Sequence, residues 1–274
     1  MKASWLKSYD RLSGLAPAKF ALAALMTFDR RKKLSIMNRQ RDYVALLQSG
    51  DARRAIHREV NGILLEQTER WPHYDYGEGY LYQSFEPLGF SGYRQTAARV
   101  EALGLRERLK DRRVLDVGTN TGAILCSVHD VLAHGFGIDI NPYLVRIAAA
   151  MAKSLGTDKL EFQATAFEDL PGDSRFDAVL SLANHSTYDE NTKQSIEDYF
   201  ARCARHCEPG GILIFESHPP AIEDADQLAR SIAALEQHFE VEERFMTPLT
   251  GFLDKDRTCV IARRREDEGQ SKKA

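Results

Sequence analysis

The sequence has few cysteines and no long uninterrupted apolar run. Its four cysteines are scattered over 274 residues and form no CxxC pair. This spacing excludes a disulfide framework and offers no structural zinc motif. The most apolar stretch, 15–28, is interrupted by Lys19, has no small-residue cleavage site after it and is too short to cross a bilayer. We therefore expect a cytoplasmic protein with no transmembrane segment and no bound metal.

A strong net charge is also absent, but the charges are unevenly distributed. The net charge is −3, whereas residues 1–70 hold 14 Lys or Arg against 7 Asp or Glu. Such a basic arm can attract a nucleic acid, an anionic lipid or a phosphorylated substrate. A solvated helical face explains the same residues equally well. The overall pI of about 6.3 is low for a nucleic-acid-binding protein, so nucleic acid is the less favoured partner.

The chain divides by composition into four segments. Residues 1–70 have apolar residues at helical spacing, which predicts an N-terminal helical cap or arm. Residues 71–93 are rich in aromatic residues and glycine, and predict an ordered loop that is either a seam to the main domain or a lid over a ligand. Residues 94–265 form the main domain. Residues 266–274 are a polar tail that we expect to be disordered.

Short apolar runs alternate with helical patterns from residue 94 onward. This alternation is typical of βαβ units and a parallel sheet, so the expected fold class is α/β. The expected parallel strands are Arg113–Val117, Gly135–Ile140, Leu160–Ala164, Ala178–Leu182 and Ile212–Glu216. The expected helices lie near Thr121–Leu132, Pro142–Leu155, Asn191–Cys207 and Ala225–Phe239. Two last strands, Val241–Met246 and Thr258–Arg263, flank a loop containing Pro and Gly and predict an antiparallel pair at the edge of the sheet.

The most specific motif is VLDVGTNTG, which starts at residue 114 and describes a buried strand, a turn and the start of a helix. Gly118 and Gly122 let the backbone approach a ligand closely, and the helix start offers free amide groups. A dinucleotide site would need G-x-G-x-x-G here. Asn120 and Ala123 stand where the second and third glycines would be. The turn therefore suits a ligand without a pyrophosphate, whose amino acid end lies along it.

Two acids lie toward the ends of the first two strands. Asp116 is placed to face the ammonium group of such a ligand. Asp139 ends the second strand, 17 residues beyond Gly122. A carboxylate there can accept both hydroxyls of a ribose, in a dinucleotide enzyme as well, so it indicates a ribose and not which cofactor. The alternative role for Asp139 is the N-cap of the next helix, for which Asn141 is the better candidate.

The combined motifs resemble the class I S-adenosylmethionine-dependent methyltransferases. The resemblance covers residues 94–265. It implies a Rossmann-like seven-stranded sheet, mostly parallel with an antiparallel final hairpin, and S-adenosyl-L-methionine as the cofactor.

Further positions follow from this resemblance. The segment FQATAFEDLP resembles the family's third motif, beside the adenine. Ala166 stands where the family often has an acid, so the resemblance implies adenine contacts at Ala166 and Phe167, through the Phe167 side chain and backbone amides. The segment FDAVLSLANHSTY resembles the fourth strand, with Leu182 near the transferring methyl group. Arg94, in GYRQTAARV, matches the basic or aromatic residue that often holds the cofactor's carboxylate. A surface arginine of a helix is the alternative interpretation.

Polar side chains after the fourth and fifth strands are the candidate catalytic residues, because ligands of open α/β sheets bind at that edge. They are His185, Asp189, Glu216 and His218. A histidine titrates in the useful pH range, so we expect His185, in a polar loop, to be the base, with His218 second. Histidines that only hydrogen-bond their loop are the alternative. Proximity can supply ~7–11 kcal/mol of the acceleration, so a base is needed only for a weakly acidic hydroxyl or a protonated amine.

We expect the acceptor to be a small molecule, such as a sugar or a specialised metabolite, methylated on oxygen or nitrogen beneath the aromatic segment. The first alternative is an RNA methyltransferase that uses the basic arm. The second is a catalytically silent regulator that binds the cofactor. An oxidoreductase is more distant, because Asn120 and Ala123 oppose a dinucleotide. The sequence leaves the acceptor and the oligomeric state open.

Overall fold

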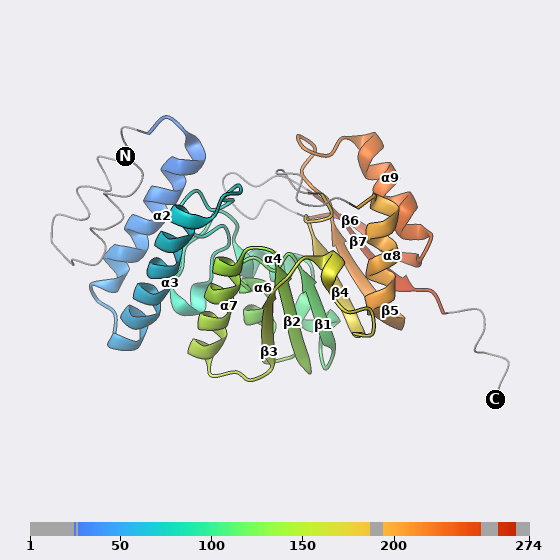
Figure 1. The fold of residues 1–274 in the computed structure, drawn as a ribbon, viewed down its shortest axis with the longest axis horizontal. Helices are drawn as coiled ribbons and strands as arrows, with labels where there is room; N and C mark the ends of the chain where they lie inside the picture. The colour runs from blue at the N-terminus through green and yellow to red at the C-terminus, as the bar shows by residue number, and fades with distance from the viewer. Residues whose placement is uncertain (1–24, 26, 187–193, 248–256, 267–274) are drawn as a thin grey trace.

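A seven-stranded sheet is the centre of the fold in the computed structural model, which describes residues 25, 27–186, 194–247 and 257–266 (Figure 1). The strand order is β3-β2-β1-β4-β5-β7-β6. The strands are β1 (Arg113–Val117), β2 (His134–Asp139), β3 (Leu160–Ala164), β4 (Phe176–Leu182), β5 (Cys207–Glu216), β6 (Phe239–Thr247) and β7 (Arg257–Arg264). Strands β1 to β5 run parallel, and β7 is antiparallel to both β5 and β6. The predicted Rossmann-like sheet with an antiparallel final pair is confirmed.

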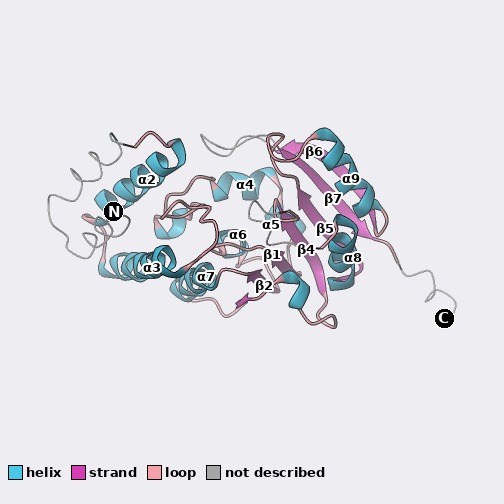
Figure 2. Cartoon of the chain, turned by 45° about the horizontal axis from the view of Figure 1, so that its top comes forward, coloured by secondary structure: helices cyan, strands magenta, loops and turns pink. Residues whose placement is uncertain are grey.

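Helices cover both faces of the sheet (Figure 2). One face carries α4 (Thr96–Ala102), α5 (Leu105–Arg108) and α6 (Ala123–Val128), and α7 (Pro142–Leu155) packs beside α6. The other face carries α8 (Ile196–His206) and α9 (Ala225–Glu236). Within the described residues, no helix is long and apolar enough to span a membrane.

Alternate residues of the central strands pack against the helices on opposite faces of the sheet. In β1, Val114 packs with α4, α5 and α6, whereas Leu115 and Val117 pack with α8 and α9. Side chains of a strand point alternately to opposite faces, so a parallel sheet covered on both sides needs near-continuous apolar runs. This requirement is why the five parallel strands could be recognised in the sequence.

The residues that begin and end helix α7 can be recognised in the sequence. Asn141 Oδ1 accepts hydrogen bonds from the backbone N–H groups of Tyr143 (3.0 Å) and Leu144 (3.4 Å), and Pro142 occupies the first turn. Gly156 ends the helix with φ of +68°, a conformation that glycine adopts without steric cost. The predicted bounds of this helix and the N-cap role of Asn141 are confirmed.

Two N-terminal helices, α2 (Arg30–Leu46) and α3 (Asp51–Arg70), precede the sheet domain. Arg39 Nη2 donates to Asn61 Oδ1 at 3.1 Å and links the two helices. The apolar face of α3 packs against α7, in a cluster that includes Val60 and Met151. The helices expected between residues 1 and 70 are therefore present from Arg30 onward, and residues 1–24 lie outside the described part.

The aromatic segment 71–93 joins these helices to the sheet domain. It contains one short 3-10 helix, η2 (Glu86–Leu88), and is otherwise irregular. Phe85 and Phe90 are buried in the same cluster as α3 and α7. The Tyr80 hydroxyl donates to Asp42 of α2, and Ser91 N donates to the same carboxylate at 2.8 Å. The segment is therefore a seam that connects α2, α3 and the sheet domain.

Several predicted boundaries are wrong, two for a tertiary reason and two for a local one. Strand β5 begins at Cys207, five residues before the predicted start, because Cys207 pairs with Phe176 of β4 before a register shift. Helix α9 ends before Phe239 because that residue starts β6 and is buried. Helix α6 begins after Gly122, whose φ of +69° keeps the turn out of the helix. Helix α8 begins after Ser195, which caps it, and residues 191–193 of the predicted helix lie outside the described part.

Candidate active site

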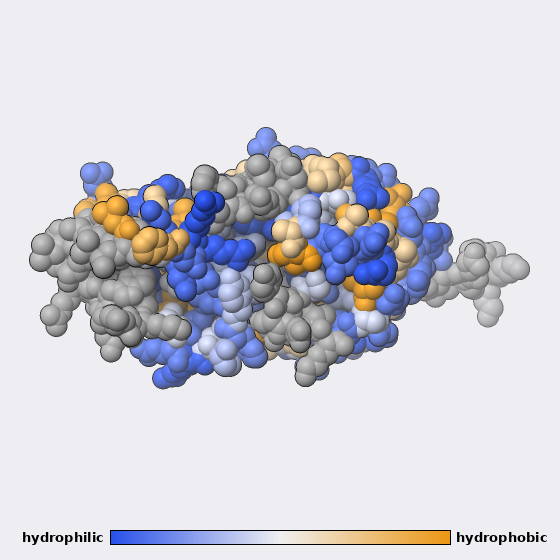
Figure 3. All heavy atoms as spheres, turned by 90° about the horizontal axis from the view of Figure 1, so that it is seen from above, coloured by the Kyte–Doolittle hydropathy of each residue, from blue (hydrophilic) through white to orange (hydrophobic). Residues whose placement is uncertain are grey.

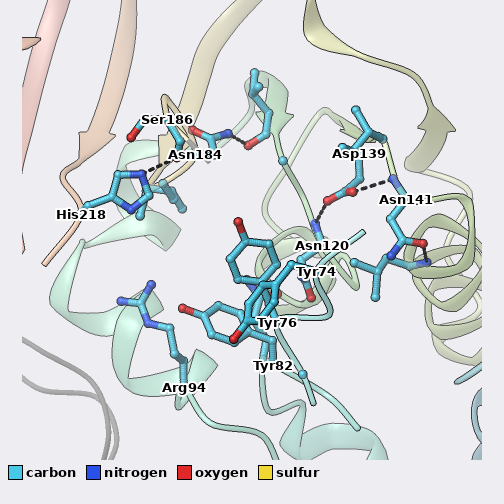
Figure 4. A pocket seen from close by; sticks show the side chains of 18 of the residues that line it. Tyr74, Tyr76, Tyr82, Arg94, Asn120, Asp139, Asn141, Asn184, Ser186 and His218 are labelled. Carbon is cyan, nitrogen blue, oxygen red and sulfur yellow. Dashed lines mark hydrogen bonds between the residues drawn. The ribbon is translucent and has the colours of Figure 1, made fainter. Parts of the chain in front are cut away.

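A cavity of about 420 Å³ lies at the carboxyl ends of β1, β2, β4 and β5 (Figure 4). The aromatic segment 71–93 contributes much of the facing wall. In an open α/β sheet this edge is where ligands bind. The residues predicted from the sequence that line the cavity are Arg94, Gly118, Asn120, Asp139, Phe167, Leu182 and His218. Asp116, Gly122, Ala166, His185 and Glu216 are absent from its surface, and Asp189 lies outside the described residues.

The turn after β1 is held open by three left-handed residues, Gly118 (φ +66°), Asn120 (φ +56°) and Gly122 (φ +69°). A Cβ on Gly118 would lie 2.8 Å from Asn184 Nδ2, so only glycine fits there. A Cβ on Gly122 would lie 2.8 Å from Ala148 Cβ. Gly118 therefore opens the cavity floor, whereas Gly122 allows the turn to pack against α7.

Asp139 connects the turn after β1 with the turn after β2. Its Oδ2 accepts a hydrogen bond from Asn120 N and its Oδ1 accepts one from Asn141 N, both at 2.9 Å. The carboxylate lies in the cavity wall (Figure 4). Each carboxylate oxygen has further acceptor capacity, so a ligand hydroxyl pair can be bound in addition to these amides. The structure thus brings Asp139 to the surface where its predicted ribose contact would occur.

Asp116 is buried below the same turn. Thr119 Oγ1 donates to its Oδ2 at 2.7 Å. Burial raises the pKa of Asp116 to about 7, although the Thr119 hydrogen bond and Arg99 oppose that shift. The predicted contact of Asp116 with an ammonium group stays a prediction, because its side chain lies beneath the surface of the cavity.

The segments that follow β3 and end β4 lie beside the cavity, but only some of their residues line it. Phe167 starts the 3-10 helix η3 (Phe167–Asp169), lines the cavity and makes an edge contact with Tyr199, with ring centroids 5.6 Å apart. Ala166 precedes η3 and supplies no surface to the cavity. Leu182 ends β4 at the cavity, and its carbonyl accepts a hydrogen bond from Arg99 at 3.4 Å.

Buried guanidinium groups surround Glu216 at the end of β5. Arg94 Nη2 lies 3.2 Å from Glu216 Oε1, and Arg99 donates to both carboxylate oxygens. Burial alone would raise the pKa of Glu216, but Arg99, Arg94 and Arg257 outweigh it and lower that pKa to about 2. Glu216 is therefore a permanent anion that orients arginines, and the earlier option of Glu216 as a base loses its chemical rationale.

The two predicted histidines occupy different environments. His218 lines the cavity, and its Nε2 is 2.6 Å from the carbonyl oxygen of Ser186 (Figure 4). Burial, reinforced by His185, lowers the pKa of His218 to about 4. His185 is only 5% exposed and pairs through Nε2 with Glu223 Oε1 at 3.0 Å. His218 therefore faces the cavity and His185 is absent from its surface, while the catalytic role of either histidine stays a prediction.

Several cavity residues were missed by the sequence reasoning. Four tyrosines of the aromatic segment form a chain of edge contacts across the wall, with neighbouring centroids 5.0 to 6.2 Å apart; they are Tyr74, Tyr76, Tyr82 and Tyr93. The sequence shows that this segment is rich in aromatic residues, but their spacing does not indicate which rings face the cavity. Arg257, at the start of β7, and Asn184, whose Nδ2 donates to the Val117 carbonyl, also line the cavity. Neither has a sequence signal, since both are placed by pairing of distant strands.

Comparisons with known proteins agree with this architecture. Residues 114–211 match the model of a methyltransferase domain family. A solved structure of the N-methyltransferase NodS from Bradyrhizobium japonicum WM9 has a TM-score of 0.51 and 19% identity, over 62% of this chain and 98% of that one. The same protein with S-adenosyl-L-homocysteine has a TM-score of 0.51 and 15% identity, over 79% and 100%. No curated protein matches this chain significantly.

A further solved structure, the PH0226 protein from Pyrococcus horikoshii OT3, has a TM-score of 0.51 and 16% identity, over 63% of this chain and 95% of that one. Identities this low establish a shared fold. The match of residues 114–211, which include the glycine turn and the acid after β2, identifies a methyltransferase domain, and its fold and motifs are those of the class I S-adenosylmethionine-dependent methyltransferases. The protein is therefore a methyltransferase whose cofactor is S-adenosylmethionine.

The cavity fits this cofactor. Gly118 lines the cavity and leaves space that a Cβ, 2.8 Å from Asn184 Nδ2, would fill. Asp139 presents a carboxylate to the cavity, and Phe167 presents an aromatic side chain. A glycine-bordered floor beside an acid and an aromatic ring suits an adenosine carrying an amino acid chain.

Proposed function

We propose that the protein transfers a methyl group from S-adenosylmethionine to an oxygen or nitrogen of a small-molecule acceptor, with His218 accepting the acceptor's proton. The observation that carries this proposal is the position and tautomer of His218. It is half-buried in the cavity wall, next to the end of β5. When bound, the cofactor supplies an electrophilic methyl group on a sulfonium.

The tautomer of His218 follows from its hydrogen bond. The Ser186 carbonyl oxygen can only accept, so His218 Nε2 carries the hydrogen. In the neutral ring, Nδ1 then bears the lone pair. A pKa of about 4 keeps the ring neutral at pH 7. Nδ1 is therefore the available proton acceptor on this side of the cavity, and the proton of an acceptor O–H or N–H would pass to it as the new bond to carbon forms.

The remaining predicted site residues have positioning roles in this proposal. Asp139 would accept the ribose hydroxyls, and Phe167 would pack against the adenine. Gly118 and Asn120 would lie along the amino acid chain, whose carboxylate Arg94 would bind. Holding both reactants in line can account for about 7–11 kcal/mol of the barrier, so proximity is the larger part of the catalysis.

The shape of the site supports a small acceptor over RNA. The cavity is enclosed on one side by the sheet edge and on the other by the tyrosines of the segment 71–93. In this proposal the segment acts as a lid as well as a seam, and residues 1–70 form a cap on the domain 94–265. A lid and cap of this kind exclude water from the reacting atoms.

The experiment is to incubate the purified protein with S-adenosylmethionine and fractionated small-molecule extracts, and to follow S-adenosyl-L-homocysteine and methylated products by mass spectrometry. With the acceptor so found, His218→Gln should lower turnover by about 100-fold, the usual contribution of a general base. Its affinity for S-adenosylmethionine should stay within about twofold, because the binding residues are untouched. His238→Gln is the matched control. Full turnover in His218→Gln would refute the role of His218, and product formation only from RNA would refute the small acceptor.

A further inference from the structure

Three guanidinium groups line one wall of the cavity, around a single buried carboxylate. Arg94, Arg99 and Arg257 all contribute to the cavity surface, and all three lower the pKa of Glu216. A single arginine would have been enough to neutralise Glu216. Burying a charged group costs several kcal/mol, so a wall with this composition indicates a function beyond pairing one carboxylate.

The guanidinium wall lies on the acceptor side of the cavity. Arg257 Nη1 donates to the carbonyl of Ser217, the residue before His218, at 3.2 Å, and its charge helps to lower the pKa of His218. In Figure 4, Arg94 and His218 lie on one side of Tyr74, Tyr76 and Tyr82, whereas Asp139 and Asn120 lie on the other.

The charges on this wall are unequal in number among the described residues. Arg94, Arg99 and Arg257 contribute three positive charges and the buried Glu216 contributes one negative charge; burial raises the pKa of Asp116, which also interacts with Arg99, to about 7, so that carboxyl is only partly charged at pH 7. All three arginines already contact protein groups, but a guanidinium has five N–H donors, so contacts to protein and to a ligand anion are compatible. The mutual repulsion is visible at Arg99, where burial first, and then the charge of Arg94, lowers the pKa.

The cofactor accounts for one anion at most. S-adenosylmethionine carries a single carboxylate, which the proposed function assigns to Arg94. Arg257 donates to the carbonyl of Ser217, the residue before His218, and Pro219 and Ile222 of the same loop add an apolar part to the cavity wall. Ile222 is 38% exposed, and in Figure 3 hydrophobic side chains form small patches between hydrophilic ones. The acceptor side thus combines a cationic wall with an apolar and aromatic rim.

We infer that the acceptor is an organic anion, a small molecule whose carboxylate or phosphate is bound by Arg257 while its hydroxyl or amino group faces His218. Its apolar or planar body packs against the tyrosine wall. In the transfer, the acceptor's O–H or N–H bond breaks, its proton goes to His218 Nδ1, and the electron pair forms the new bond to the methyl carbon. The carbon–sulfur bond breaks and its electrons stay on sulfur. This inference rests on the proposed function, of which it specifies the substrate class.

The test uses the full-length protein saturated with S-adenosyl-L-homocysteine, so that the cofactor's own carboxylate is already in place. Binding of inorganic phosphate and of benzoate is measured by calorimetry, with benzamide as the neutral probe. Both anions should bind, and benzamide should bind at least about tenfold more weakly, because hydrogen bonds to a charged group are worth about 1.5–3 kcal/mol. If the loaded protein binds neither anion, or binds benzamide equally well, the inference is wrong.

Variants locate the anion on the wall. Arg257→Gln should weaken anion binding about tenfold or more, and Arg257→Lys should retain part of it, since the charge remains but the planar fork is lost. Arg263→Gln, an exposed residue paired with Glu242, is the control and should bind normally. Unchanged anion binding in a folded Arg257→Gln protein would overturn the inference.

A separate variant distinguishes this inference from the proposed function. His218→Gln should keep anion binding while losing turnover. The wild-type protein is also offered small carboxylates and phosphates that carry a hydroxyl or amino group. If it binds anions but methylates none of these compounds, the proposed function fails and the anion site stands. If neutral acceptors are methylated as fast as their anionic counterparts, for example 4-hydroxybenzamide and 4-hydroxybenzoate, the inference fails and the proposed function stands.

Discussion

The two halves of the cavity are built in different ways. The cofactor half, at the ends of β1 and β2, is made of a turn and two short loops in which Asp139 bonds residues that are 2 and 19 positions away. The acceptor half, at the ends of β4, β5 and β7, depends on partners much farther apart. Arg94 and Glu216 are 122 positions apart, and His185 and Glu223 are 38 apart.

This difference affects which changes each half can tolerate. A local turn is specified by positive backbone angles and by small residues, so a single Cβ or a lost carboxylate damages it directly. The acceptor half is a network of buried charges in which each member is oriented by others. We therefore expect cofactor affinity to respond to changes in the first half, and turnover with little change in that affinity to respond to changes at His218, Glu223 and Arg257 in the second.

The largest expected effect concerns Asp116, which lies under the cofactor half. Its folded pKa of about 7 is above the ordinary value of 3.8, so the folded protein keeps a proton that the unfolded chain releases. Stability is therefore greatest below pH 4 for this group and falls as pH rises to about 7. Asp116→Asn should raise the free energy of unfolding at pH 8 by up to about 4 kcal/mol, and by much less at pH 4. Denaturant titrations of the cofactor-free protein at both pH values measure this; an equal effect at both would contradict the raised pKa.

Asp139→Ala should produce the next largest effect. Two turns lose a common acceptor, and the cofactor loses its proposed ribose contact. We expect the affinity for S-adenosylmethionine to fall by at least ~100-fold, since two or more hydrogen bonds to a charged group are removed. Calorimetry measures the affinity, and Asp226→Ala, on the exposed start of α9, is the control. Affinity within a few-fold of the wild type would mean that the cofactor half does not depend on this acid.

Glu223→Gln examines the acceptor half. Glu223 accepts from His218 N at 2.9 Å and pairs with His185, and its charge raises the pKa of His218 against the effect of burial. Removing the charge should lower the His218 pKa further, which makes it a weaker base and slows turnover about tenfold. NMR titration of the histidine ring, together with kinetics, separates this effect from misfolding. Weaker cofactor binding with an unchanged His218 pKa would break the proposed division between the halves.

Ala183→Gly should produce the smallest effect, at the boundary of the two halves. Ala183 lines the cavity with φ of +60°, which costs an L-residue about 1–2 kcal/mol. Glycine relieves that strain but adds chain entropy, so a net stabilisation of about 0.5–1 kcal/mol is expected. Ala201→Gly, within α8, should instead destabilise by about 1 kcal/mol. Thermal unfolding of the two variants and the wild type measures both effects. If both variants are less stable than the wild type, Ala183 is not strained.

Much of the cofactor half could be predicted from the sequence. The buried strand, the glycine turn and Asp139 follow one another within 26 residues, and their order implies their geometry. The N-cap at Asn141 and the bounds of α7 were found for the same reason. Prediction was weaker at the acceptor half. His185 and His218 were both recognised as candidates, but which of them faces the cavity depends on Glu223, a residue without a motif.

The sequence by itself determined the α/β class, the order of strands and helices and the position of the turn after β1, because apolar periodicity, glycine and caps act over a few residues. Only the tertiary structure decided that Glu216 is surrounded by arginines, that His185 lies behind His218, and which tyrosines face inward. Those arrangements depend on strand order and helix packing, which bring together residues from 38 positions apart, as for His185 and Glu223, to 122 apart, as for Arg94 and Glu216, and no short-range pattern records such contacts.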